Sequence, residues 1–191
     1  MKIFFVASIY GREKNKINYE GIVNILKKTG NKVEADHVLK TRKEKLAALD
    51  NEGKVDFHKK VIDGVKASDV VVSEISTPSM SVGYLISLAL DCNKPTVVLY
   101  SGEKEPHILS TIEKSEKLLV LKYRGIDDLK DSLTDLVDDA SDQMDVRFNF
   151  FISPKIGAYL DWISKQKKLP RAVYLRRLIE EDMKKRKEFK A

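Results

Sequence analysis

Short apolar runs alternate with helix-like segments through the first 140 residues, and this alternation constrains the fold more than any other feature. Strand-like runs cover residues 3–8, 32–38, 69–75, 96–100 and 118–123. Helix-like spacing covers residues 17–28, 57–67, 82–92, 108–114 and 126–137. Short buried strands separated by helices form a parallel sheet that is covered on both faces. The sequence therefore predicts an α/β fold, a five-stranded doubly wound parallel sheet of the Rossmann/flavodoxin-like class.

The length of the chain fits one domain with a small appendage. Its 191 residues are 42% hydrophobic, which is enough for a packed core. The segment before residue 145 is rich in Asp and contains the polar run Ala140-Ser-Asp-Gln143. We therefore expect a boundary there, with a first domain over residues 1–140 and a second over residues 146–191.

Charge is distributed unevenly between these two parts. Residues 146–191 carry 13 Lys and Arg against 5 Asp and Glu, whereas residues 1–145 carry 22 against 24. A near-neutral body with a basic end of net charge +8 is typical of a protein that meets a polyanion. The apolar runs are too short to span a bilayer, and Cys92 alone cannot form an internal disulfide. We expect a cytoplasmic protein with no membrane partner.

After Asp145 the pattern of apolar residues changes to a period of two. Val146, Phe148, Phe150 and Ile152 alternate with polar or outward-facing residues, which predicts a strand. Two helix-like patterns then follow over residues 156–163 and 173–179, and Ser153-Pro154 suits the start of the first helix. One strand and two helices cannot bury a core alone, so pairing with a second copy is expected.

This strand-helix-helix order resembles the ribbon-helix-helix module, whose intertwined dimer inserts a two-stranded ribbon into the DNA major groove. The resemblance implies that Arg147, Asn149 and Phe151 face the bases of duplex DNA and that Arg171 contacts a phosphate. Arg and Asn suit guanine and adenine edges, whereas Phe is less typical at such a position. Two alternatives remain, a basic dimerisation tail and a module that binds a protein partner.

A candidate ligand loop follows the apolar run at residues 70–72. It reads Pro78-Ser-Met-Ser-Val-Gly-Tyr-Leu85 and leads into an apolar helix pattern. Unpaired N–H groups and the positive end of a helix suit a phosphate, and Ser79 and Ser81 add hydroxyl donors. Gly83 would let the backbone approach a ligand closely. An ordinary strand-to-helix turn explains the spacing equally well.

The loop is similar to the signature of the nucleoside 2-deoxyribosyltransferase-like family, which includes 2'-deoxynucleoside 5'-monophosphate N-glycosidases. In that family the loop reads Pro-Ser-x-Gly-Val-Gly-Tyr-Glu. The resemblance covers residues 1–124 and is carried also by three further segments. These are Phe5-Val-Ala-Ser-Ile-Tyr-Gly-Arg12, Asp69-Val-Val-Val-Ser-Glu-Ile75 and Leu109-Ser-Thr-Ile112.

The resemblance implies a homodimer or higher homo-oligomer that binds a deoxynucleoside monophosphate. The residues implied around the 5'-phosphate are Ser8, Ile9, Arg12, Ser79, Ser81 and Gly83, with the partner subunit's Ser110. Ser81 replaces a glycine of the family pattern.

Two acids of the family are missing from this chain. The position of the nucleophilic Glu is Leu85, and the position of the second acid, eight residues before Asp69, is Val61. Neither aliphatic side chain can attack C1' or protonate a leaving base. Glu74 has a counterpart in the family that is not the nucleophile, and Asp63 is two residues from Val61, on another side of its helix. We therefore predict no catalytic residues.

Among the histidines, His37 matches a family histidine, while His58 and His107 are expected at the surface. No metal-ligand spacing or P-loop is found, so no metal or cofactor is expected.

These observations favour a nucleotide-binding protein with an inactive N-glycosidase-like pocket, joined to a DNA-binding module that makes it a ligand-responsive transcriptional regulator. One alternative is an active N-glycosidase or 2-deoxyribosyltransferase with relocated acids, in which the tail only dimerises. The other is a non-catalytic interaction scaffold.

Overall fold

The computed structural model describes residues 1–111, 115–142, 152–167 and 171–186. The chain divides into two compact units, Met1–Asp145 and Val146–Ala191. In the described part of the chain, none of the helices is long and apolar enough to cross a membrane.

The first unit is built on a five-stranded parallel sheet. Its strands are β1 (Lys2–Ala7), β2 (Lys32–Glu34), β3 (Val70–Glu74), β4 (Thr96–Tyr100) and β5 (Leu118–Lys122). Their order across the sheet is β2-β1-β3-β4-β5, and all four pairings are parallel. This is the flavodoxin-like order, so the predicted fold is confirmed. The order reverses between β1 and β3, and ligands of such sheets bind at the carboxyl ends of strands at this point.

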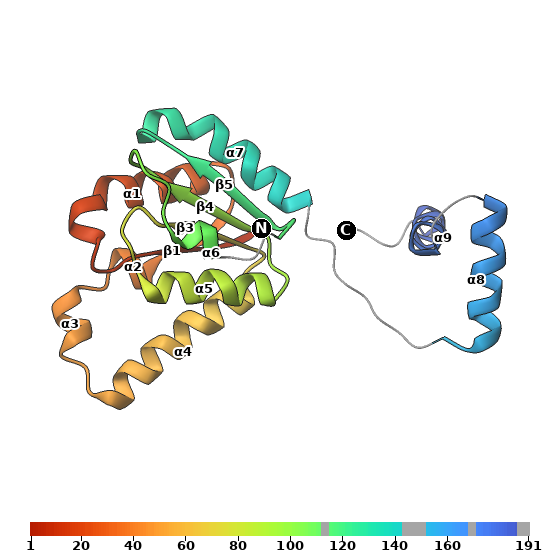
Figure 1. Ribbon diagram of the computed structural model, residues 1–191, viewed down its shortest axis with the longest axis horizontal. Helices are drawn as coiled ribbons and strands as arrows, with labels where there is room; N and C mark the ends of the chain where they lie inside the picture. Colours follow the sequence, from red (N-terminus) through yellow and green to blue (C-terminus); the bar gives the residue numbers. More distant parts are fainter. Residues whose placement is uncertain (112–114, 143–151, 168–170, 187–191) are drawn as a thin grey trace. The chain divides into compact units, whose positions relative to one another are not determined.

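Helices cover both faces of the sheet (Figure 1). One face packs on α1 (Arg12–Lys28) and α7 (Ile126–Asp142), through a core that includes Phe5, Val72 and Leu133. The other face packs on α4 (Asn51–Ala67) and α5 (Met80–Asp91), through a core that includes Phe4 and Val71. Because successive strand residues point to opposite faces, every residue of the central strand β3 is buried.

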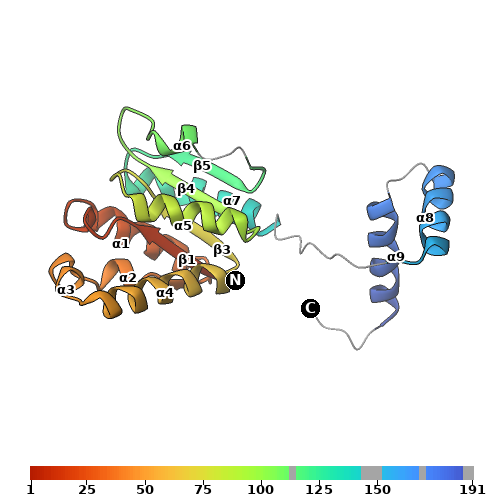
Figure 2. The same ribbon diagram turned by 60° about the horizontal axis from the view of Figure 1, so that its bottom comes forward.

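The second strand is shorter than the sequence predicts. β2 ends at Glu34, and α2 (Asp36–Leu39) follows where residues 36–38 were expected to be extended. The N–H groups of Val38 and Leu39 both donate to the carbonyl of Ala35, which closes a helical turn. Two further short helices, α3 (Lys43–Ala47) and α6 (Ile108–Thr111), complete the unit (Figure 2). The sequence did not predict α3.

The end of the predicted first domain lies within a helix. α7 continues to Asp142, and Ala140, the last residue of the predicted domain, is fully buried.

The second unit contains α8 (Pro154–Lys167) and α9 (Arg171–Lys185). The N–H of Ile156 donates to Ser153 Oγ over 3.4 Å, which confirms the predicted N-terminal cap. Leu160 and Ile163 of α8 are buried, whereas Trp162 is 56% exposed. Residues 146–151, where a strand is predicted, lie outside the described residues, and Ile152 is not in a strand.

Candidate functional site

Two loops meet at the reversal point of the sheet. One follows β1 and contains Gly11, and the other follows β3 and contains Thr77. Asn15 Nδ2 joins them by donating to Thr77 Oγ1 over 2.8 Å and to the carbonyl of Gly11 over 3.1 Å. A Cβ at Gly11 would lie 2.5 Å from Thr77 Oγ1, so only glycine fits this close approach. The loops are therefore held against each other where the fold places its ligands.

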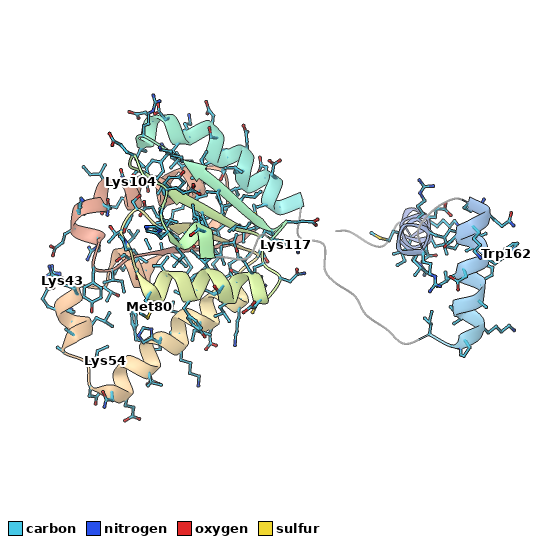
Figure 3. All side chains as sticks on the ribbon, viewed as in Figure 1. Lys43, Lys54, Met80, Lys104, Lys117 and Trp162 are labelled. Carbon is cyan, nitrogen blue, oxygen red and sulfur yellow. The ribbon has the colours of Figure 1, made fainter. Side chains whose placement is uncertain are left out.

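The loop after β3 ends at the positive end of α5. Ser79 caps this twelve-residue helix and accepts a hydrogen bond from the N–H of Val82 over 3.4 Å. Met80 is 93% exposed beside the cap (Figure 3). Such a terminus carries a partial positive charge that favours an anion.

A cavity lies next to this terminus, and we call it the α4–α5 cavity. Its lining residues come from β1 and its loop, α2, α3, α4 and the first turns of α5. They are Ala7, Ile9, Tyr10, His37, Leu46, Phe57, His58, Val61, Ser79, Ser81, Val82 and Leu85. Ile9, Ser79 and Ser81 are thus three predicted ligand residues that the fold brings to one cavity.

Val61 and Leu85 line this same cavity from two different helices. Their side chains are 6% and 8% exposed and belong to one apolar cluster. Among the described residues that line the cavity, none is a carboxylate. The two positions expected to have lost their acids therefore do lie together.

His37 is a polar residue in the lining of this cavity. Its ring stacks on Phe4 with centroids 4.7 Å apart, and Nε2 is buried without a hydrogen-bond partner in the described part of the chain. Burial lowers the pKa of His37 to about 4, against a smaller opposing effect of Asp36. The imidazole is therefore neutral near pH 7. His58 and His107 are exposed, as predicted, although His58 also borders the cavity.

Glu74 points to the face of the sheet that packs on α1 and α7, and it is not among the residues that line the cavity. Its side chain is fully buried and shares a face with Val72, Tyr19 and Tyr123. Oε1 accepts hydrogen bonds from the N–H of Ser76 at 3.2 Å, from the Ser76 hydroxyl, and from the Tyr123 hydroxyl at 3.1 Å. Burial raises the pKa of Glu74, although these hydrogen bonds oppose the shift. Glu74 therefore fixes the start of the β3–α5 loop and does not reach the cavity.

Ser8 and Arg12 are placed differently from Ser79. Ser8 is buried, and its Oγ accepts from the N–H of Gly11 over 3.2 Å, so it shapes the turn after β1. Arg12 Nη1 donates to the carbonyl of Thr41 over 3.2 Å. That contact directs the guanidinium into a neighbouring groove between α1 and α3. Among the described lining residues, Ile9 alone is shared with the α4–α5 cavity.

Gly83 and Ser110 also lie outside the lining of the α4–α5 cavity. A Cβ at Gly83 would lie 2.6 Å from Ile108 Cδ1, so this glycine allows α5 to pack against α6. Ser110 is exposed on α6, where its hydroxyl donates to the carbonyl of His107 over 2.7 Å. Asp63 is exposed on α4, as expected of a residue that faces away from Val61.

Sequence reasoning missed two hollows near this site. One, of about 670 Å³, lies between the loops after β3 and β4 and has Ser76, Ser101, Lys104 and His107 in its wall. The other is the groove that contains Arg12. The charged run Lys40-Thr-Arg-Lys-Glu-Lys45 was the available signal for the groove, because it supplies Arg42 and Lys43.

Of the residues predicted to contact DNA, Arg147, Asn149 and Phe151 lie outside the described residues. Arg171 begins α9, as predicted, and pairs with Asp161 of α8. The described residues contain no group of three His, Cys, Asp or Glu side chains that could hold a metal ion.

Comparison with known proteins finds sequence relatives that are named as deoxynucleotide N-hydrolases. No family profile matches the chain. A 5-hydroxymethyl-dUMP N-hydrolase of Danio rerio is 33% identical over 104 residues, which is 52% of this chain and 68% of the relative. A second enzyme of that name, from Rattus norvegicus, is 32% identical over 98 residues, 51% of this chain and 60% of the relative.

The fold has a counterpart among solved structures. A 2-deoxyribosyltransferase from Bacillus psychrosaccharolyticus matches with a TM-score of 0.51 and 14% identity, over 69% of this chain and 91% of that chain. With the sequence matches and the flavodoxin-like sheet, we conclude that the chain belongs to the nucleoside 2-deoxyribosyltransferase-like family.

Proposed function

We propose that the first unit binds a deoxynucleoside 5'-monophosphate without cleaving its N-glycosidic bond, and that the second unit binds duplex DNA. The observation that carries the first half is the lining of the α4–α5 cavity. Val61 and Leu85 occupy the positions of the two acids, and no carboxylate is among the described lining residues. Retaining cleavage of a glycosidic bond needs one carboxylate as nucleophile and a second group as acid.

Neighbouring groups do not supply a replacement. Glu74 is held by Ser76 and Tyr123 and does not line the cavity, and Asp63 is exposed. His37 borders the cavity, but its lowered pKa leaves it neutral near pH 7, so it is a poor proton donor to a departing base.

Binding remains compatible with this lining. The capped N-terminus of α5 and the hydroxyls of Ser79 and Ser81 suit a phosphate. Tyr10 and Phe57 offer aromatic surfaces against which a base can stack. The lining therefore offers a phosphate anchor and an apolar wall, and the cavity measures about 60 Å³, which is room for part of a nucleotide.

For the second unit, charge and exposed apolar surface support the proposal. Residues 146–191 carry a net +8, which favours a polyanion. Ile156, Trp162 and Ile179 are 49%, 56% and 60% exposed on α8 and α9, and a second copy of the unit would cover them. Coupling of the two units gives a ligand-responsive, homodimeric transcriptional regulator.

A second candidate is an active N-glycosidase or deoxyribosyltransferase whose acids have moved. The names of the sequence relatives favour it, because both are N-hydrolases. A non-catalytic scaffold, with an empty cavity and a tail that binds a protein, is the third.

One titration separates the three candidates. Purified protein is titrated with deoxynucleoside monophosphates while heat and free base are both measured. We expect heat of binding without release of free base. We also expect the monophosphate, and not its nucleoside, to raise the melting temperature, because a ligand that binds only the native state stabilises it. Base release that Ser79→Ala abolishes would establish the enzyme instead. Absence of heat and of any thermal shift would favour the scaffold.

Two variants test whether the two missing acids explain the expected lack of catalysis. Leu85→Glu alone should release no base, since Val61 still leaves the cavity without a second acid. The double variant Val61→Asp/Leu85→Glu restores both carboxylates and is the one in which turnover is expected. Turnover by the single variant would contradict the requirement for a second acid.

A further inference from the structure

A basic groove lies beside the α4–α5 cavity, and we call it the α1–α3 groove. It has a volume of about 290 Å³, and its walls come from the loop after β1, from α1 and from the segment that starts α3. The lining residues are Ile9, Arg12, Glu13, Lys16, Thr41, Arg42, Lys43 and Glu44. Four cations face two carboxylates, so the groove has an excess of positive charge. Figure 3 marks Lys43 at the start of α3.

Ile9 joins the groove to the α4–α5 cavity, because it lines both. A ligand anchored by a phosphate at the N-terminus of α5 would therefore meet the groove on passing Ile9. Arg12 lies on the groove side, held there by its bond to the carbonyl of Thr41. That bond uses one of five guanidinium donors and leaves the others for a ligand.

The cations of the groove are not equally available. Lys43 pairs with Glu13 at 3.2 Å and with Glu44 at 3.9 Å, and Lys16 lies 3.8 Å from Glu20. Arg42 is exposed, its carbonyl accepts from the N–H of Leu46 over 3.1 Å, and its guanidinium has no hydrogen-bond or ion-pair partner in the described part of the chain. The lysines of the groove are thus already paired with carboxylates, whereas the two arginines keep guanidinium N–H groups available for a ligand. Guanidinium groups bind phosphate oxygens through paired hydrogen bonds.

We propose that the α1–α3 groove binds the additional phosphates of a nucleoside di- or triphosphate whose first phosphate lies at the N-terminus of α5. This inference rests on the proposed function, since it assumes a nucleotide at that terminus. It changes the ligand class, because a monophosphate would leave Arg12 and Arg42 unused. The phosphate chain would run from Ser79 past Ile9 towards Arg42.

The test compares ligands that differ only in the number of phosphates. The full chain is titrated calorimetrically, in magnesium-free buffer, with the mono-, di- and triphosphates of the four common deoxynucleosides and with pyrophosphate. We expect the triphosphate of the preferred base to bind at least tenfold tighter than its monophosphate. Arg42→Ala should remove most of that gain and leave the affinity for the monophosphate unchanged.

Lys45→Ala is the matched control, because it removes one charge from α3, the helix that Arg42 precedes, without changing the lining of the groove. It should preserve the preference for the triphosphate. Equal loss in Arg42→Ala and Lys45→Ala would indicate general charge attraction and would overturn the groove as a site. Equal binding of mono- and triphosphate would overturn the inference while the proposed function stands. Absence of binding by every nucleotide would overturn both.

Discussion

Gly11→Ala tests whether the two loops at the reversal point of the sheet hold the site together. The new Cβ would lie 2.5 Å from Thr77 Oγ1, 2.7 Å from its Cβ and 2.9 Å from its Cγ2. Relief of this overlap requires the loops to separate, which would also break the 2.8 Å bond from Asn15 to Thr77. Gly11 has a φ of −81°, so alanine itself is not strained there.

The magnitude follows from three contributions. Overpacking destabilises by about 1–3 kcal/mol and loss of the hydrogen bond by about 1 kcal/mol, offset by about 0.5 kcal/mol from a stiffer unfolded chain. We therefore expect a loss of about 1.5–3.5 kcal/mol in the free energy of unfolding, measured by urea denaturation. Weaker nucleotide binding should accompany the loss, because the same loops border the α4–α5 cavity.

Two further variants show whether the overlap is the cause. Gly11→Ala/Thr77→Gly removes the obstructing side chain and should recover the overpacking part of the loss, although not the hydrogen bond. Gly125→Ala is the control, since a Cβ there has no atom within 4 Å, and its effect should stay within about 0.5 kcal/mol. The reasoning would be refuted by a neutral Gly11→Ala, or by a double variant no more stable than the single one.

The remaining predictions concern pH, DNA and the buried acid. Burial lowers the pKa of His37 to about 4, so as the pH falls this histidine is protonated in the unfolded chain before it is protonated in the folded protein. Its contribution to the free energy of unfolding should therefore be fully present above about pH 6.5 and be lost as the pH drops towards 4. His37→Phe should flatten that part of the pH profile, measured by denaturation, and His107→Gln should not. DNA affinity of residues 146–191 should fall steeply with salt, and Arg147→Ala should remove sequence preference at about 1–3 kcal/mol. Arg171→Ala should weaken all duplexes alike in gel shift, whereas a tail that shifts no duplex at low salt would exclude DNA binding. Tyr123→Phe should destabilise the protein by roughly 1–2 kcal/mol in the same denaturation assay, because it removes a hydrogen bond to buried Glu74.

The sheet was predictable because its strands are short apolar runs with few rival interpretations. β4 has the predicted bounds, since Thr96 to Tyr100 are apolar or β-branched between Pro95 and Ser101. Predictions failed where no apolar stripe marks the structure. α1 begins at Arg12 rather than residue 17, because its first turn is charged. α3 is likewise charged and has no buried residue, so its sequence resembles a solvated loop.

The same limit applies to the site. That Val61 and Leu85 share a cavity followed from the family resemblance, since 24 positions separate them in sequence. The position of Arg12 could not be inferred, because its partner Thr41 precedes a helix that the sequence did not predict. The orientation of Glu74 was in principle accessible, since β3 alternates and Val72 and Glu74 must share a face.

The placement of Val61 and Leu85 has a consequence for how easily this cavity could regain its chemistry. Both side chains belong to the cluster that contains Phe4, Val71 and Ile86, and burial of such a side chain stabilises a protein by about 1.5–3 kcal/mol. A carboxylate at either position would exchange that gain for the desolvation of a charge. The hydrogen bonds that hold the loops of the site are made by Asn15, Thr77 and Glu74, and none of these bonds involves Val61 or Leu85. A first substitution back to a carboxylate would thus lower the stability of the protein before turnover was restored. The hydrogen bonds of the loops and the phosphate-binding end of α5 do not depend on such a substitution.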